Sequence, residues 1–212
     1  YSQSEINMLM KVAESFNFKV NTFTHVLEGY KISDKLRKHG AGASSFSDWW
    51  SFKAEVRDAI PHNAALLSNA GLVTAINSDD PEMGTRLNQE AAKSVKYGNL
   101  SEAEAWRLVT LNPARLLRVD DKIGSIKIGK LANVVIWSAN PLSVYAKAER
   151  VYIEGTKYYD IDEDEKLANK NRNVRKQILE EMLNDKTPED KKAVPVPEKQ
   201  EHYHCDSFET IE

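Results

Sequence analysis

The 212-residue sequence contains a single cysteine, Cys205, so it has no pair from which an intramolecular disulfide could form. It also has no long apolar run of the kind that spans a membrane. Its 29 basic and 32 acidic side chains leave a formal net charge of only -3, which is too balanced to favour nucleic acid or an anionic membrane surface. We therefore expect a small-molecule substrate, with neither nucleic acid nor membrane as a partner.

Several sequence signatures are also missing. The first residues, Tyr-Ser-Gln-Ser-Glu-Ile, lack a basic segment followed by an apolar core, so they do not have the form of a signal peptide. Localisation is left open between cytoplasm and periplasm. The sequence contains no glycine-rich phosphate loop, no Ser-His-Asp nucleophile pattern and no Cys-x-x-Cys pair. Among common mechanisms, hydrolysis through a metal is the one that remains.

The first part of the chain alternates strand patterns with helical patterns. Ser2 and Glu5 have the spacing of a capping box and predict an opening helix. Apolar or β-branched runs predict three strands, over residues 19–24, 41–46 and 72–77. Helical patterns follow them, over residues 30–39, 63–70 and 86–97. This order is typical of a parallel barrel, which takes about 250 residues to close, so we expect about three of its βα units here.

Two further helices precede a change of pattern. Ser101 and Glu104 have capping-box spacing, and Asn112 followed by Pro113 predicts an N-cap and the first position of the next helix. Beyond Gly124, short alternating runs predict a small antiparallel β unit, with strands over residues 125–128, 133–137 and 150–153. The predicted parallel architecture therefore ends before this point.

The composition becomes strongly charged after Asp160. One helix is predicted there, and its thin apolar stripe consists of Val174, Ile178, Leu179, Met182 and Leu183. Residues 186–200 are rich in Lys, Glu and Pro, which is typical of an extended or disordered linker. We expect this helix to dock weakly.

The most informative residues stand where two predicted strands end. The strand over residues 19–24 stops at His25, and the run from residue 72 stops at Asp79 and Asp80. The carboxyl ends of the strands form the floor of the active site in a parallel barrel, so polar residues there indicate chemistry. Imidazole is a good zinc ligand, and a carboxylate can hold a metal and accept a proton from metal-bound water. The pattern predicts a metal-dependent hydrolase, although such a centre needs three or more protein ligands.

Each of these residues also has a structural interpretation. His25 is otherwise a strand-end histidine bonded to a loop carbonyl, and Asp79 an N-cap or turn residue. Neighbours on a strand point to opposite sides, so only one of Asp79 and Asp80 can face a metal. Because Asp80 followed by Pro81 is typical of turn initiation, we assign Asp79 to chemistry and Asp80 to loop structure or a substrate contact.

Other polar and aromatic groups are given structural roles. His39 and His62 lie near helix boundaries, where histidine usually complements a helix end or faces solvent. Residues 44–50 include two adjacent tryptophans, which are more typical of packing than of a pocket wall. Residues 202–206 are metal-capable, but without supporting structure they predict adventitious binding and not catalysis.

Four short segments within residues 1–160 are informative when they are taken together. They are Asn-Thr-Phe-Thr-His at 21–25, Ala-Ile-Asn-Ser-Asp-Asp at 75–80, Thr-Leu-Asn-Pro-Ala at 110–114 and Gly-Ser-Ile-Lys-Ile-Gly-Lys-Leu-Ala-Asn-Val-Val at 124–135. Together they resemble the C-terminal half of the amidohydrolase superfamily, closest to its imidazolonepropionase-like and proline dipeptidase-like members. Asn133 replaces an aspartate that is common in the last segment, at a place remote from the metal.

The resemblance implies roles for the two strand-end residues. His25 corresponds to the metal-binding histidine ending the sixth barrel strand, and Asp79 to the metal-associated catalytic aspartate ending the eighth. The implied cofactor is a divalent metal, with zinc favoured, as one or two ions in the complete enzyme. The family's His-x-His pair, its mid-barrel lysine or acidic residue and its fifth-strand histidine have no counterpart here, and the last would fall just before Tyr1.

We therefore predict an α/β fold in three parts. Residues 1–118 form the C-terminal portion of a TIM-like (β/α)8 barrel, 119–160 a partial β-sandwich, and 161–212 a charged helical and flexible tail. The chain is expected to be a fragment of a metal-dependent amidohydrolase that cleaves an amide, cyclic amide or related C–N bond and is inactive alone. Its expected partner is the remainder of the barrel or another copy of the chain. The alternative is a noncatalytic interaction or assembly module derived from the same fold.

Overall fold

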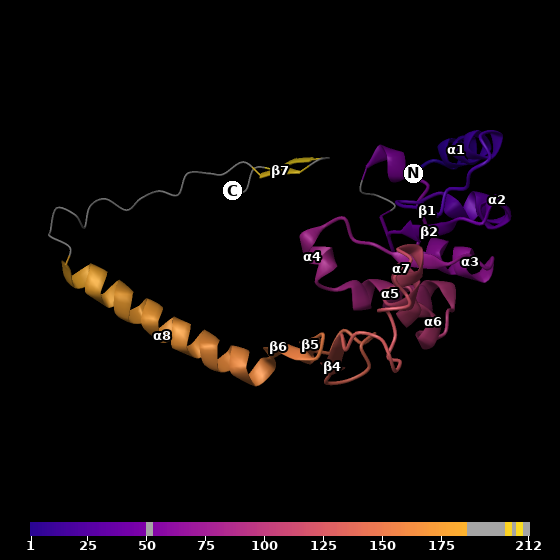
Figure 1. Cartoon of the computed structure of the whole chain (residues 1–212). Coiled ribbons are helices and arrows are strands. Elements are labelled where there is room, and N and C mark those ends of the chain that lie inside the picture. The colour runs from indigo at the N-terminus through magenta and orange to yellow at the C-terminus, as the bar shows by residue number, and fades with distance from the viewer. Residues whose placement is uncertain (50–52, 186–201, 205–206, 210–212) are drawn as a thin grey trace. The chain divides into compact units, whose positions relative to one another are not determined.

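The computed structural model describes residues 1–49, 53–185, 202–204 and 207–209 (Figure 1). The chain forms two compact units, Tyr1–Tyr158 and Tyr159–Glu212. The predicted linker over residues 186–200 lies outside the described residues.

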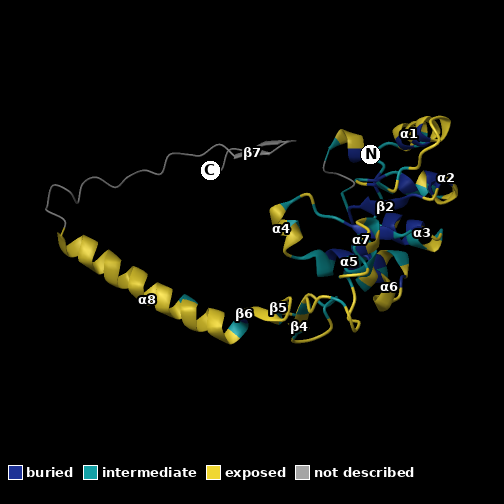
Figure 2. Ribbon diagram, in the orientation of Figure 1, coloured by how far each residue is buried: buried dark blue, intermediate teal, exposed yellow. Residues whose placement is uncertain are grey.

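A three-stranded parallel sheet forms the centre of the first unit. Its strands stand in the order β1 (Thr22–Phe23), β2 (Gly42–Ser45) and β3 (Thr74–Ile76). Every residue of β2 and β3 is buried, as Figure 2 shows, and small or apolar residues on both faces suit such strands. All three strands are shorter than predicted.

Helices join the strands in the predicted order. They are α1 (Gln3–Ser15) before β1, η1 (Gly29–Ile32) and α2 (Ser33–His39) between β1 and β2, and η2 (Ala54–Val56) and α3 (Asn63–Asn69) between β2 and β3. Ser2 is the N-cap of α1, and its hydroxyl accepts a hydrogen bond from the backbone of Ser4. Gly40 ends α2 and Gly71 follows α3, both with the left-handed backbone that glycine adopts at low cost.

Buried apolar side chains form three clusters around the sheet. The largest includes Met10, Phe23 and Leu36 and joins α1 and α2 to β1. A separate cluster of Leu27, Phe46, Val56 and Ala59 lies under the segments that follow β1 and β2. Because burying a large apolar side chain contributes about 1.5–3 kcal/mol, these clusters hold the ends of the strands in place.

Four helices follow β3: α4 (Pro81–Gly84), α5 (Leu87–Gly98), α6 (Glu102–Arg107) and α7 (Leu111–Leu116). The capping box of Ser101 and Glu104 is present at the start of α6, as predicted. The predicted N-cap role of Asn112 is wrong, because Thr110 occupies the N-cap of α7. Asn112 lies in the first helical turn, and its Nδ2 donates to the carbonyl of Thr74 in β3 at 2.8 Å.

The capping box allows a stability prediction. The Ser101 hydroxyl, and then its backbone N–H, donates to Glu104 and holds the pKa of that carboxyl below its ordinary value of 4.5. Ser101→Ala should lower the free energy of unfolding by about 1 kcal/mol at neutral pH, whereas Ser101→Asp should retain the cap. Because the folded pKa of Glu104 is lowered, the carboxylate's contribution is complete above pH 4.5 and is lost as pH falls through the folded value. Urea unfolding at pH 7 and at about pH 3.5 measures both effects, and an alanine variant as stable as wild type at pH 7 contradicts them.

A second sheet ends the first unit. Its strands are β4 (Val134–Trp137), β5 (Ala148–Ile153) and β6 (Thr156–Asp160), in that order, and β4 and β5 pair antiparallel with a register shift at Ile136/Trp137. The strand predicted over residues 125–128 is wrong, because Ser125 is a bend, residues 126–127 have no regular structure and Ile128 begins a turn. Ile126 and Ile128 are 88% and 102% exposed, so the alternation of apolar and polar residues in this segment is not accompanied by packing of the isoleucines. Assignment of the sheet to a partial β-sandwich stays a prediction.

The second unit contains helix α8 (Ile161–Asp185) and a two-stranded antiparallel sheet of β7 (His202–His204) and β8 (Ser207–Glu209). Acidic residues fill the first turn of α8, where they complement the helix dipole. The five predicted stripe residues of α8 are all exposed. The predicted boundaries at residues 118 and 160, and the character of the tail, stay predictions. No described helix combines the length and hydropathy of a membrane span.

Candidate functional site

His25 and Asp79 lie just beyond the carboxyl ends of β1 and β3, on either side of β2. Their side chains meet, with His25 Nε2 3.3 Å from Asp79 Oδ2. The two side chains are 34% and 51% exposed, so the pair is accessible from solvent. Because the strands are parallel, their carboxyl ends share one edge of the sheet, and residues far apart in the sequence meet there.

Both residues have a left-handed backbone, with φ of 59° at His25 and 60° at Asp79. This conformation is uncommon for residues other than glycine and clusters at functional sites. Hydrogen bonds to β2 hold it, because Val26 N–H donates to the Ser44 carbonyl and Asn77 N–H to the Ser45 carbonyl, each at 3.0 Å. The central strand therefore fixes both turns that present the pair.

Aromatic rings surround the imidazole. The His25 ring stacks on Tyr1, with centroids 5.9 Å apart, and lies 5.1 Å from the Phe46 ring. Phe46 in turn stacks on Trp49 at 4.0 Å and an interplanar angle of 11°. These rings leave the imidazole edge, which carries Nε2, directed at Asp79.

Asp80 has the loop role predicted for it. It is the N-cap of α4, and its Oδ1 accepts a hydrogen bond from the backbone of Met83 at 2.8 Å. Asp79 is therefore not the cap of this helix, but it lies in a bend, so its structural interpretation as a turn residue still stands. Its carboxylate faces His25 instead.

The His25–Asp79 pair fits two corners of a metal site. A tetrahedral ion bonded at about 2.1 Å to a nitrogen and an oxygen holds those two atoms about 3.4 Å apart, close to the observed separation. In the part of the chain that the structure describes, no group of three or more His, Cys, Asp or Glu side chains could hold one ion together. A centre of this kind needs three or more protein donors, so this pair by itself would not complete one.

The other predicted histidines have structural positions. His39 is 3% exposed, so the expectation that it faces solvent is wrong, whereas its place in the last turn of α2 agrees with the expectation that it complements a helix end. Its Nε2 accepts from Val20 N–H at 3.0 Å and its Nδ1 lies 2.9 Å from Glu14 Oε1, which links α2 to α1 and to the approach to β1. His62 stands at the N-cap of α3, 6.4 Å from the Tyr97 ring.

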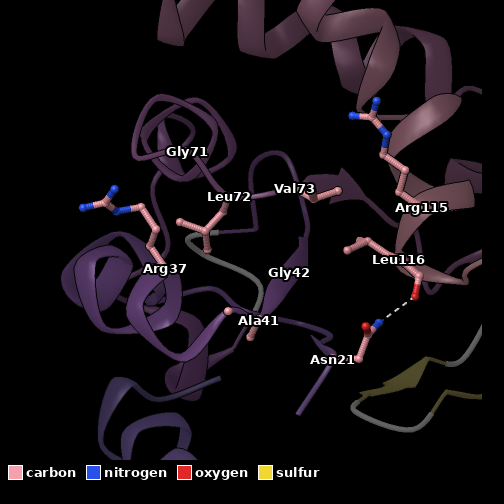
Figure 3. A pocket seen from close by; sticks show the side chains of 10 residues that line it. Asn21, Arg37, Ala41, Gly42, Gly71, Leu72, Val73, Arg115 and Leu116 are labelled. Carbon is pink, nitrogen blue, oxygen red and sulfur yellow. Dashed lines mark hydrogen bonds between the residues drawn. The ribbon is translucent and has the colours of Figure 1, made fainter. Parts of the chain in front are cut away.

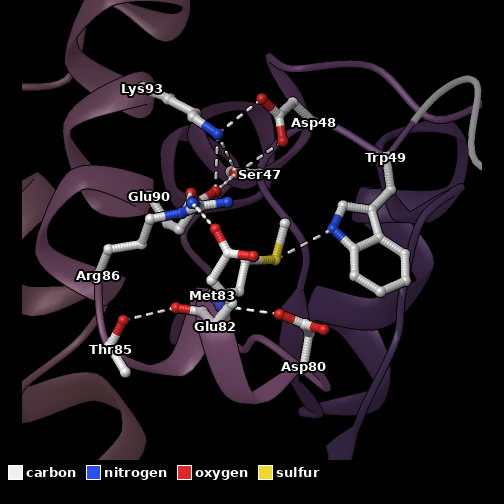
Figure 4. A network of polar contacts seen from close by, with 10 residues as sticks. All are labelled: Ser47, Asp48, Trp49, Asp80, Glu82, Met83, Thr85, Arg86, Glu90 and Lys93. Carbon is white, nitrogen blue, oxygen red and sulfur yellow. Dashed lines mark hydrogen bonds and ion pairs between the residues drawn. The ribbon is translucent and has the colours of Figure 1, made fainter. Parts of the chain in front are cut away.

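A buried polar cluster beside the site was not predicted (Figure 4). Glu90 of α5 is 2% exposed, accepts from the Ser47 hydroxyl, and lies 2.8 Å from Lys93 Nζ and 3.4 Å from Arg86 Nε. Lys93 also pairs with Asp48 at 2.7 Å. Burial alone lowers the pKa of Lys93, but its hydrogen bonds to Asp48 and Glu90 outweigh burial and raise that pKa above 10.5. The sequence signal, acid and base residues three and four apart on a helix, is typical of a solvated face.

A cavity of about 210 Å³ lies at the opposite end of the sheet, where the chain enters β2 and β3 (Figure 3). Asn21 lines it and donates from Nδ2 to the Leu116 carbonyl at 2.9 Å. A Cβ at Gly42 would stand 2.1 Å from Leu116 Cδ2 and 3.0 Å from the Val73 carbonyl, so a larger residue there requires the Leu116 side chain to move. The amino ends of barrel strands serve stability and not chemistry, so we assign this cavity no function.

Comparison with known proteins shows the family to which the chain belongs. Residues 51–176 match the amidohydrolase family, and the chain therefore belongs to that family. Amidohydrolase tasK of Hapsidospora irregularis is 29% identical over 165 residues, which are 76% of this chain and 17% of that protein. An amidohydrolase from Thermotoga maritima superposes with a TM-score of 0.69 and 30% identity, over 74% of this chain and 41% of that one.

A prolidase in complex with N-methylphosphonate-L-proline is similar in fold alone, with a TM-score of 0.53 and 20% identity over 76% of this chain and 50% of that one. The chain thus spans half or less of the length of these relatives. The predicted resemblance to the amidohydrolase superfamily is confirmed. The predicted α/β fold is confirmed too, and its neighbours are consistent with a partial TIM barrel.

Proposed function

We propose that the chain supplies two metal-binding residues, His25 and Asp79, to a metal-dependent hydrolase that cleaves an amide, cyclic amide or related C–N bond of a small molecule. The observation that supports this most strongly is the 3.3 Å separation of His25 Nε2 and Asp79 Oδ2 at the carboxyl edge of a parallel sheet. Membership of the amidohydrolase family supports the reaction class.

Each residue has a defined task in this proposal. His25 holds the ion through Nε2, which requires the tautomer with its proton on Nδ1. Asp79 holds it through Oδ2 and accepts the proton of the attacking water at a carboxylate oxygen. When bound, a divalent ion, with zinc favoured, supplies Lewis acidity that makes water a nucleophile near neutral pH, as one or two ions in the complete enzyme.

Because the chain supplies only two of the proposed metal donors, the proposal also requires a partner. Since a catalytic zinc site takes about three protein ligands, the remaining donors come from the rest of the barrel or from another copy of the chain. A sheet of three strands also leaves strand edges at which further strands can pair. On its own the chain is therefore expected to be inactive.

Metal binding by the complete protein tests this proposal. Wild type should retain one or two divalent ions per chain after dialysis, measured by elemental analysis. His25→Gln should weaken binding by more than the roughly 10–100-fold that loss of a supporting group costs, measured by competition with a chelator. His62→Gln is the matched control, because His62 is exposed and should not alter affinity.

A protein that is metal-free, and whose residual metal affinity does not change in His25→Gln, contradicts the proposal. It would favour instead the noncatalytic assembly module, for which the absence of a three-donor group among the described residues is the supporting observation.

A further inference from the structure

Four consecutive residues after β2, Phe46–Trp49, contact both sides of the candidate site. Phe46 is 2% exposed and packs against the His25 ring with centroids 5.1 Å apart. Trp49 stacks on Phe46, and its Nε1–H donates to Met83 Sδ in α4 at 3.3 Å. The segment thus touches His25 directly and α4 at its far end.

Helix α4 is the element that follows Asp79. Asp80 is the N-cap of this helix, and its side chain accepts a hydrogen bond from the backbone N–H of Met83. The position of Met83 is therefore coupled to the position of Asp79 through one short turn of helix. Contacts run without interruption from the imidazole through the Phe46 and Trp49 rings to the Met83 thioether in α4. Figure 4 shows the last of these contacts, between Trp49 and Met83.

The polar cluster anchors the same segment from the other side. Ser47 donates to the buried Glu90, and Asp48 pairs with Lys93. Arg86 then links Glu90, at 3.4 Å, to Glu82 of α4, at 2.8 Å. Each of the four residues Phe46–Trp49 therefore contacts a residue outside this segment.

The His25–Asp79 pair needs such support because it is not held by its own burial. Both side chains are one third or more exposed, and an exposed side chain keeps rotamer freedom that a fixed contact must overcome. Metal sites require their donors within about 0.5 Å of the productive geometry.

We infer that the Phe46–Trp49 segment is a positioning element that sets the separation of His25 Nε2 and Asp79 Oδ2. Its consequence for metal binding rests on the proposed function, but the positioning itself is independent of any metal. Phe46 and Trp49 touch no reacting atom in this role and act through His25 and α4.

The test is NMR of the full chain in metal-free buffer, with 15N-labelled histidine. In wild type, Asp79→Asn should shift the imidazole resonances of His25. In a Trp49→Leu background, the same substitution should produce a shift at least twofold smaller, because the two side chains no longer meet. Trp49→Phe keeps a ring on Phe46 but removes the donor to Met83 Sδ, so it should reduce the shift as Met83→Leu does.

Trp106→Leu is the matched control. Trp106 lies in α6 with its ring edge-on to Trp137 at 6.2 Å, and its loss should leave the His25 shift unchanged. Met83→Leu is the second variant, because it conserves side-chain volume and should preserve the fold even if Trp49→Leu does not. It removes the sulfur that accepts the Trp49 hydrogen bond, so it should also make the His25 shift smaller.

A full-sized shift in both Trp49→Leu and Met83→Leu overturns the inference and leaves the segment with a packing role alone. If the shift is reduced while wild type binds no metal, the proposed function fails and the positioning stands. If wild type binds metal, Trp49→Leu should also weaken affinity by roughly 10–100-fold, as loss of a supporting group does.

Discussion

Asp79→Asn is expected to lower turnover of the complete enzyme by roughly 10²–10⁴-fold, the range for loss of a general base, while preserving the fold. Asparagine keeps the shape of the side chain and tolerates the left-handed backbone that Asp79 adopts at φ 60°. Under the proposed function, it removes the negative charge that would hold a cation and the basic oxygen that would accept a proton. The expected change is therefore in chemistry and not in structure.

Asp80→Asn provides the matched comparison for that experiment. Asparagine is as good an N-cap as aspartate, so α4 should retain its first turn. We expect kcat/KM of this variant to stay within about threefold of wild type, which is under 1 kcal/mol of transition-state stabilisation. Steady-state kinetics with circular dichroism on both variants makes the comparison, and full activity of Asp79→Asn refutes the assignment.

Lys93→Met should lower the free energy of unfolding by about 2 kcal/mol, since it removes a charge-assisted hydrogen bond from a buried carboxylate that keeps its other partners. Lys93 pairs with both Asp48 and Glu90, and Glu90 is almost completely buried. Arg86 and Ser47 still contact Glu90 in the variant, which places the expected loss at the lower end of the usual range. The loss arises mainly from the missing ion pairs to Glu90 and Asp48, because methionine retains the packing of the lysine stem.

Lys96→Met is the control, because Lys96 lies in the same helix, is exposed, and contacts the Tyr97 ring at 5.4 Å. Its effect should stay within about 0.5 kcal/mol. The pKa of Lys93 is raised, so its contribution is complete below 10.5 and is lost as pH rises through the folded value. Urea unfolding at several pH values from 7 to about 9 should therefore give a constant difference between Lys93→Met and wild type. Equal stability of the two methionine variants contradicts this prediction.

Signals that act over a few residues predicted much of the local structure. The capping box of Ser101 and the glycine stops at Gly40 and Gly71 each satisfy or terminate the backbone of one helix, so near neighbours suffice to identify them. The strand over residues 72–77 was visible because it is apolar on both faces. Its observed core, Thr74–Ile76, is shorter because only those residues pair with β2.

The sequence predicted the His25–Asp79 pair for a related reason. His25 and Asp79 each interrupt an apolar or β-branched pattern at its end, and a parallel arrangement brings such ends to one edge. The sequence did not contain the reason for their contact, which depends on β2 lying between their strands and bonding to both turns. Their catalytic and metal-binding roles stay proposals.

Long-range packing produced the features that local patterns misassigned or missed. Glu90 belongs to a spacing typical of a solvated helix face, yet it is 2% exposed and bonds to Ser47 in the loop after β2, so its ion pairs have one buried partner. Asn112 has the form of a cap, but the approach of β3 gives its amide a backbone carbonyl to bind. Ile126 and Ile128 alternate as a strand does, and without a partner strand they form none.

Amino-acid order is therefore sufficient for most of the longer helices, the three parallel strands and the polar residues at their ends, because caps, glycines and periodicity act through neighbouring backbone atoms. Contacts between distant segments are required for the His25–Asp79 separation, the burial of Glu90 and the ring stack beside them. These depend on which elements become adjacent, and that adjacency arises only when the sheet and its helices pack together.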